Sequence, residues 1–415
     1  MSATRGSRID DREDRPPQDS GIVRSRHPSR LAGVRDLFLL DPDLVFLNHG
    51  SFGACPAEVL EAQRRWQLEM ERNPVEFLGR RSAQLLAQAR ASLGGLLGAR
   101  GDDLVFVPNA TTGVNVVARS LPLDAGDEVL TTDLEYGACD ATWQRVCAQR
   151  GAHYRRVEVP LPYERAAVVE RLLAALTPRT RLIYLSHITS TTALILPVAE
   201  VCAAARARGI ATLVDGSHAP GQIDVDLTAI GADFYVGNCH KWLCAPKGAG
   251  FLHARPEYHA LLDATVTSWG YAEGTGGHSG FDAYLGRTVF ERRLQWQGTR
   301  DISAWLAVPA AIEFQVRHAW PRVRERCHEL ARHALHTLIR RHRLAAIAPD
   351  DDWAQMVAIP VPLQEPDTLR RRLFEESRIE MPVTTHAGQV FVRLSVQGYN
   401  TPENIEHLLA APALR

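Results

Sequence analysis

Short apolar runs, rich in branched residues and each about as long as a β-strand, recur between residues 104 and 253. They occupy residues 104–107, 128–131, 182–186, 210–214, 234–236 and 249–253. The intervening segments place apolar residues at helical spacing, as in 114–121, 141–149, 168–176 and 198–208. Because strands and helices alternate, we expect right-handed crossovers and a mostly parallel sheet with helices on both faces. Ligands should then bind beyond the carboxyl ends of the strands.

The pattern changes after residue 299. Long helical patterns cover residues 303–317 and 321–341. Strand-like runs follow at 356–359 and 390–395, with one helical pattern between them and another at the end of the chain. Residues 1–30 mix Arg, Asp, Pro and Ser with little to bury, which is typical of a disordered tail. We therefore predict a tail (1–30), a large α/β domain (31–300) and a smaller C-terminal α+β domain (301–415).

Composition narrows the classes of function. Lysine plus arginine (47) nearly equals aspartate plus glutamate (48), so no overall charge would attract nucleic acid or an anionic membrane. The 7 cysteines lack the CxxC spacing of zinc or thiol-exchange sites, which suits a reducing compartment. No apolar run approaches the roughly 20 residues of a membrane helix. We expect a cytoplasmic protein that holds no metal and acts on a small molecule.

A lysine follows the predicted strand 234–236, within the segment GNCHKW at 237–242. A lysine whose neighbours suppress its charge is a nucleophile that can form an imine with an aldehyde. Lys241 is therefore a candidate for that chemistry. The alternative is a surface lysine whose stem lies along Trp242.

An aspartate ends the strand before it. Asp215 follows the apolar run 211–214 and precedes Gly216, Ser217 and His218. A carboxylate there can keep the ring nitrogen of pyridoxal 5'-phosphate (PLP) protonated, which makes that cofactor an electron sink. His218 could reach the ring's phenolic oxygen. The alternative is that Asp215 caps the next helix.

The run 104–107 is followed by PNATTG at 108–113 and then by a helical pattern. Backbone N–H groups at a helix start, two hydroxyls and a glycine can bind a phosphate. Ordinary capping of the helix by Thr111 or Thr112 is the alternative. The chain has no GxxxxGK[ST] loop, and no GxGxxG segment follows a strand, which disfavours nucleotide cofactors.

Ordered motifs over about residues 44–410 resemble the class V aminotransferases of PLP fold type I, in the isopenicillin N epimerase-like branch. They are LNHGSFG (47–53), PNATTGVN (108–115), EYGA (135–138), SHITSTTALILPV (186–198), LVDGSHAPG (213–221), GNCHKW (237–242), QGTRD (297–301) and VRLSVQGYNT (392–401). The resemblance implies a large domain with a mostly parallel seven-stranded sheet. It also implies PLP as the cofactor.

The resemblance also implies roles for single residues. Lys241 would carry PLP as a Schiff base, and Asp215 would partner its ring nitrogen. Tyr136 would stack on the cofactor, unless it is a buried core tyrosine. The remaining cofactor contacts would come from Thr111, Thr112, Asn238 and His240 near the phosphate and from Ser190 and His218 near the phenolic oxygen.

For the substrate, the resemblance implies that Arg393 binds the α-carboxylate, a task suited to a planar bidentate donor. Asn48 and His49 would line the substrate mouth. The segment of Gln297, Gly298 and Thr299 matches one that reaches the partner subunit's phosphate in related enzymes, which implies a homodimer whose site the partner completes.

The reaction stays open at this stage. The epimerase-like resemblance suggests that Lys241 removes the Cα proton and that a second acid, Tyr136, His49 or a water, returns one on the opposite face. Alternatives are a carbon–sulfur lyase acting on a cysteine S-conjugate and an aminotransferase. Related desulfurases carry a nucleophilic cysteine shortly before the carboxylate arginine, whereas no cysteine follows Cys327 here.

A non-catalytic PLP-fold module is a more distant alternative. It would need an attached DNA-binding domain of about 60 residues, which residues 1–30 cannot supply. The sequence does not indicate the substrate side chain. The glycine-rich segment within 268–293 is either a mobile loop near the site or a surface excursion.

Overall fold

The computed structural model describes residues 34–271 and 285–415. The tail predicted for residues 1–30 and residues 272–284 of the glycine-rich segment lie outside the described residues. The described residues belong to one compact unit, and the boundary placed at residue 300 remains a prediction. Within the described ranges, no helix combines the length and the apolar character that crossing a membrane requires.

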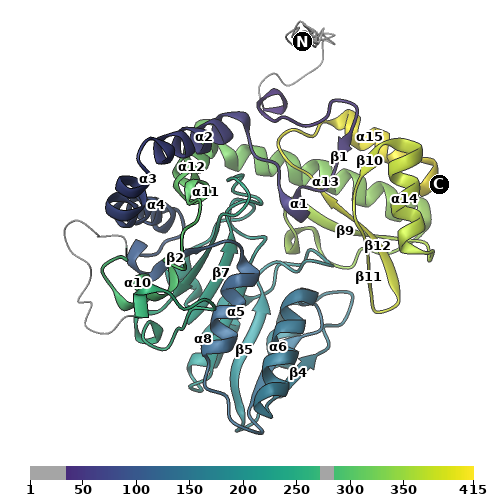
Figure 1. Ribbon diagram of the computed structural model, residues 1–415. Coiled ribbons are helices and arrows are strands. Elements are labelled where there is room, and N and C mark those ends of the chain that lie inside the picture. The colour runs from purple at the N-terminus through teal and green to yellow at the C-terminus, as the bar shows by residue number, and fades with distance from the viewer. Residues whose placement is uncertain (1–33, 272–284) are drawn as a thin grey trace, which may run out of the picture. The chain divides into compact units, whose positions relative to one another are not determined.

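A seven-stranded sheet with the order β2-β8-β7-β6-β5-β3-β4 forms the centre of the fold (Figure 1). Strands β4, β3, β5, β6 and β7 pair in parallel, and β8 pairs antiparallel with both β7 and β2. The predicted α/β fold with a mostly parallel sheet is thus confirmed. The strands are β2 (Leu104–Val107), β3 (Glu128–Thr132), β4 (His153–Val157), β5 (Thr180–Ser186), β6 (Ala211–Gly216), β7 (Phe234–Asn238) and β8 (Gly250–Ala254).

Both faces of this sheet are buried, which explains why its strands are continuous apolar runs. In β2, Leu104 and Phe106 join one hydrophobic cluster, whereas Val105 and Val107 join the other. Successive side chains of a strand point to opposite faces, so each face receives its own core. Helices contacting the sheet include α5 (Ala110–Ser120), α6 (Gly137–Arg150), α7 (Arg165–Ala174) and α8 (Val198–Arg206).

Helices also precede this sheet along the chain, where the apolar pattern gave no expectation. They are α1 (His49–Phe52), α2 (Ala57–Arg72), α3 (Pro74–Glu76) and α4 (Ser82–Leu96), with β1 (Val45–Phe46) before them. The short helix α9 (Leu227–Ile230) lies between β6 and β7, and α10 (Val289–Leu294) lies between the sheet and the C-terminal part.

The C-terminal part contains an antiparallel sheet of order β11-β12-β9 that contacts α13 and α14. The helix predicted for 303–317 is divided at Ala307, because α12 starts anew with Pro309 in its first turn, where the missing N–H costs nothing. The elements are α11 (Ser303–Leu306), α12 (Val308–Arg317), α13 (Trp320–His342), β9 (Met356–Val361), α14 (Pro366–Ser377), β10 (Ile379–Glu380), β11 (Val383–His386), β12 (Gln389–Ser395) and α15 (Pro402–Ala410).

Candidate active site

A pocket of about 230 Å³ lies at the carboxyl ends of β5, β6 and β7, beside the start of α5. This is where a mostly parallel sheet is expected to bind a ligand. The pocket unites most of the residues singled out in the sequence. Its lining residues are Ser51, Phe52, Asn109, Thr111, Tyr136, Ser186, Ile188, Ser190, Asp215, Ser217, His218, Asn238, His240 and Lys241.

Lys241 lies in the loop between β7 and β8, and its side chain enters the pocket. Its Nζ is 3.2 Å from Nε2 of His218. Burial, followed by the charge of Arg393, lowers the pKa of Lys241 to about 8, and Asp215 and Cys139 oppose this shift. At pH 7 roughly a tenth of such an amine is uncharged, compared with less than about a thousandth for an ordinary lysine, and the uncharged form is a nucleophile or a base.

Asp215 lies near the end of β6 and is 3% exposed. Its Oδ1 accepts hydrogen bonds from the backbone N–H (2.9 Å) and the hydroxyl (2.5 Å) of Ser217. Its Oδ2 accepts from the Tyr184 hydroxyl at 3.3 Å and the Cys139 thiol at 3.7 Å. All these donors are neutral, so they orient the carboxylate without cancelling its charge. Asp215 does not cap a helix in this arrangement.

The start of α5 forms another side of the pocket, next to Lys241 and Asp215. Asn109 is its N-cap, and Oδ1 of Asn109 accepts from the backbone N–H (2.9 Å) and the hydroxyl (3.1 Å) of Thr112. The alternative that Thr111 or Thr112 caps the helix is therefore wrong, because Asn109 is the capping residue. Thr111 lines the pocket, whereas the Thr112 hydroxyl is directed to Asn109.

Two residues of the lysine loop complete this side. Oδ1 of Asn238 accepts from the N–H of Ala110 at 2.9 Å, which attaches the lysine loop to the helix start. Nδ1 of His240 donates to the carbonyl oxygen of Ala249 at 2.9 Å. Burial lowers the pKa of His240 to about 4. The backbone N–H groups at the start of α5 suit an anion.

Arg393 lies on β12 directly behind two lining residues of the pocket and is 5% exposed. Its Nη1 donates to the carbonyl oxygen (2.6 Å) and hydroxyl (3.2 Å) of Ser190, and its Nη2 donates to the Ser51 hydroxyl at 3.0 Å. Both serines line the pocket. Burial lowers the pKa of Arg393 to about 10. Tyr136 also lines the pocket and is 47% exposed, so it is not a core tyrosine.

Besides Thr112 and Arg393, three further predicted site residues are not among those that line the pocket. His49 is fully buried, with Nδ1 3.0 Å from the Tyr399 hydroxyl and Nε2 3.0 Å from the carbonyl oxygen of Lys241. Oδ1 of Asn48 accepts from the Ser51 hydroxyl at 2.6 Å. Thr299 is exposed. Within this chain, His49 and Asn48 thus contact residues that belong to the site.

Sequence reasoning missed a buried carboxyl group behind the pocket. Glu135 accepts hydrogen bonds from the hydroxyls of Ser186 and Thr132, both at 2.6 Å. Burial raises the pKa of Glu135 to about 8, and the nearby charges of Asp215 and Asp140 add to the shift. The only hint in the sequence was its place directly before Tyr136.

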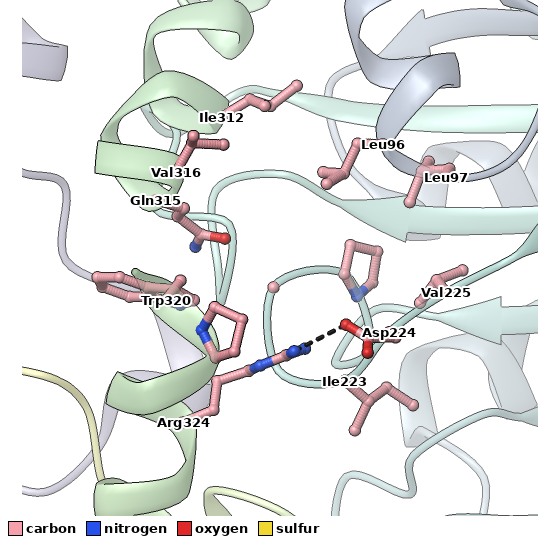
Figure 2. A pocket seen from close by; sticks show the side chains of 13 residues that line it. Leu96, Leu97, Ile223, Asp224, Val225, Ile312, Gln315, Val316, Trp320 and Arg324 are labelled. Atoms are coloured by element: carbon pink, nitrogen blue, oxygen red, sulfur yellow. Dashed lines mark hydrogen bonds and ion pairs between the residues drawn. The ribbon is translucent and has the colours of Figure 1, made fainter. Parts of the chain in front are cut away.

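A second cavity, of about 330 Å³, lies between α12, the start of α13 and the loop 220–225 (Figure 2). Its walls are mostly apolar, and Figure 2 shows the ion pair of Arg324 and Asp224, with N and O 2.7 Å apart, on one side. It holds neither a lysine nor a carboxylate poised beside one. Although it is the larger cavity, the reactive groups are in the first pocket. Among the described residues, no cluster of three or more His, Cys, Asp or Glu could hold a metal ion.

The fold and the pocket are those of a PLP-family enzyme, and the chain belongs to the class V aminotransferase family, whose sequence model matches residues 45–408. It is 42% identical to the isopenicillin N epimerase of Streptomyces clavuligerus over 387 residues, or 91% of this chain and 96% of that protein. It is 31% identical to a probable chloroplastic L-cysteine desulfhydrase of Arabidopsis thaliana over 404 residues, covering 89% of this chain and 82% of that protein. The predicted family is confirmed.

Solved structures agree on the fold. A complex of the cystine C-S lyase C-DES with cysteine persulfide superposes with a TM-score of 0.74 at 25% identity, covering 90% of this chain and 98% of that one. An apo cysteine desulfurase from Thermococcus onnurineus NA1 gives 0.76 at 20% identity, covering 91% and 95%. The second likeness shows the fold alone.

Proposed function

We propose that this protein binds PLP through Lys241 and inverts the configuration at Cα of an amino-acid substrate. The observation that carries the proposal is the pocket that holds Lys241 and the buried Asp215 together, with Arg393 hydrogen-bonded to the lining residues Ser190 and Ser51. The 42% identity to an isopenicillin N epimerase over nearly the whole chain favours epimerisation among the possible reactions.

The residues present fit PLP at each of its functional groups. The uncharged amine of Lys241 suits the aldehyde, and Asp215, held by neutral donors only, suits a protonated ring nitrogen. The start of α5, with Thr111 and the neighbouring Asn238 and His240, suits the phosphate. Ser190 and His218 are proposed to contact the phenolic oxygen, and Tyr136 the ring face. When bound, PLP would withdraw electrons from the bonds of the substrate Cα.

In this proposal the chain's own residues act on the substrate in turn. Arg393 binds the α-carboxylate and orients the substrate. The amine of Lys241 takes the Cα proton from one side. The Tyr136 hydroxyl is the best placed of the earlier candidates to return a proton from the other, because it lines the pocket whereas both ring nitrogens of His49 are engaged elsewhere. Asn48 and His49 would support the site from behind.

A carbon–sulfur lyase is the second candidate, favoured by the 31% identity to a probable L-cysteine desulfhydrase. Persulfide transfer through a cysteine is disfavoured, because all seven cysteines are buried and none lines the pocket. A homodimer and a cytoplasmic location stay proposals. In such a dimer the partner subunit would extend to the phosphate through the segment containing Thr299, which is exposed in the single chain.

The test is to incubate the PLP-loaded protein in D₂O with a panel of free amino acids and, separately, with cysteine and its S-conjugates. An epimerase exchanges the Cα proton for deuterium and yields both configurations without a keto acid. Release of pyruvate together with sulfide or a thiol would instead establish the lyase. Keto acid formed only with an added amino acceptor would establish an aminotransferase.

A further inference from the structure

Trp242, the residue after the proposed PLP lysine, makes a hydrogen bond that fixes the state of two side chains in the pocket. Its indole Nε1 donates to Nδ1 of His218 at 3.2 Å. An indole N–H can only donate, so Nδ1 must carry a lone pair. A neutral imidazole has one N–H, and the proton of His218 is therefore on Nε2.

That assignment determines how His218 meets Lys241. Nε2 of His218 is 3.2 Å from Nζ of Lys241. A charged ammonium has three donors and no acceptor. If Lys241 were charged, its N–H donors would therefore face the N–H donor of His218, and no hydrogen bond could form between them. An uncharged amine has a lone pair and can accept this hydrogen. The contact is satisfied only if Lys241 is neutral.

We propose that Trp242 is a positioning residue, whose indole N–H holds His218 in the tautomer that donates to Lys241 and thereby favours the uncharged, reactive form of the Lys241 amine. The inference rests on the proposed role of Lys241 as the residue that binds PLP. In that reaction the amine nitrogen bonds to the aldehyde carbon, and the aldehyde oxygen leaves as water with the two amine protons.

The surroundings hold both partners in place. Trp242 is fully buried, and its carbonyl oxygen accepts from Nε2 of Gln315 at 2.7 Å. Gln315 projects from α12 in Figure 2. Gly221, with φ +88°, packs against the Trp242 backbone, where a Cβ would lie 2.4 Å from the carbonyl oxygen. The carbonyl oxygen of His218 accepts from Nε2 of Gln222 at 2.7 Å.

Other charged and titratable groups act on the pair in both directions. Arg393 faces Lys241 from β12 and opposes its protonation, whereas Asp215 on β6 and Cys139 on α6 favour it. Burial, Lys241, Arg393 and His49 together hold the pKa of His218 well below its usual value. A doubly protonated His218 is therefore disfavoured. It would also place an N–H donor on Nδ1, opposite the N–H donor of the indole.

The experiment measures how fast the full-length protein, freed of cofactor, captures PLP between about pH 6 and 10, by visible absorbance. Trp242→Phe removes the donor, so His218 can take the other tautomer and accept from a charged Lys241. We expect the pH midpoint of capture to rise by about one unit, which makes capture about tenfold slower near neutral pH. The titration of free PLP is common to all variants and cancels in the comparison.

Two variants serve as controls. His218→Gln removes a proposed PLP contact and so changes the rate of capture, but its pH midpoint should stay at the wild-type value, because the amide oxygen can accept from Trp242 while the amide nitrogen donates to Lys241. Trp353→Phe removes another buried indole N–H, one without a partner, and should also leave it unchanged. A folded Trp242→Phe protein with the wild-type midpoint would overturn the inference. So would an equal shift in His218→Gln.

A measurement on the unaltered protein decides the matter if Trp242→Phe does not fold. The ¹⁵N shifts of His218, assigned by their loss in His218→Gln, should show a bare Nδ1 and a protonated Nε2. A protonated Nδ1 would overturn the inference. Failure of the wild-type protein to capture PLP at all would instead count against the proposed function, since the tautomer is measured without the cofactor.

Discussion

Arg393 and Ser190, separated by 203 residues in sequence, are joined by a hydrogen bond of 2.6 Å from Nη1 to the serine carbonyl oxygen. Both partners of this guanidinium, Ser190 and Ser51, offer neutral oxygens, and its buried Nε has no hydrogen-bond partner. Within the described part of the chain, no carboxylate pairs with Arg393. A buried cation held this way is available to an anion that enters the pocket.

Replacing Arg393 with Ala should raise the KM for the amino-acid substrate by roughly 10- to 100-fold, since a charge-assisted hydrogen bond contributes about 1.5–3 kcal/mol. The kcat should change less, because the variant leaves Lys241 in place. Steady-state kinetics on the substrate found in the D₂O screen measures both. Arg324→Ala, which breaks the ion pair beside the second cavity, is the matched control and should leave KM unchanged. An unchanged KM in Arg393→Ala would mean that another group binds the carboxylate.

Asp215→Asn keeps the shape of the side chain and removes its charge. The protein should still capture PLP, since Lys241 is intact, but kcat should fall by at least about a hundredfold because a fixed charge at the reacting system is lost. Visible absorbance follows capture, and turnover assays follow kcat. Turnover within a factor of about two of the wild-type value would show that the charge of Asp215 is not used.

The raised pKa of Glu135 predicts how the stability of the protein changes with pH. Its pKa is raised to about 8 in the folded protein, so between about pH 4.5 and 8 the folded state binds more protons than the unfolded state. Stability contributed by this group must therefore fall as pH rises through that window. Glu135→Gln removes the titration, and the gain in Tm of the variant over wild type should grow from pH 5 to pH 8. A gain independent of pH would contradict the assignment.

The sequence predicted the central sheet well where strands are buried on both faces. The run predicted at 104–107 is β2 with the same ends. The edge strand β4 (His153–Val157) escaped the apolar pattern, because it pairs with β3 alone and carries His153, Arg155 and Arg156. Its existence followed only from the resemblance to a family with a seven-stranded sheet.

The candidate site was predictable where a polar residue lies at or shortly after the carboxyl end of a strand, as Lys241, Asp215 and Thr111 do. Contacts that depend on side-chain orientation were not. No spacing rule places the indole of Trp242 on His218, or turns both ring nitrogens of His49 away from the pocket. The composition held one unused signal, since lysine occurs only at positions 241 and 247 and arginine supplies the rest of the 47 basic residues.

That scarcity makes the central claim directly testable. The protein is mixed with PLP, reduced with borohydride, digested, and its peptides are analysed by mass spectrometry. The account predicts a pyridoxyl group on Lys241, no label on the exposed Lys247, full labelling in Lys247→Arg and none in Lys241→Arg. Label on Lys247, or none on either lysine despite an intact fold, would contradict it.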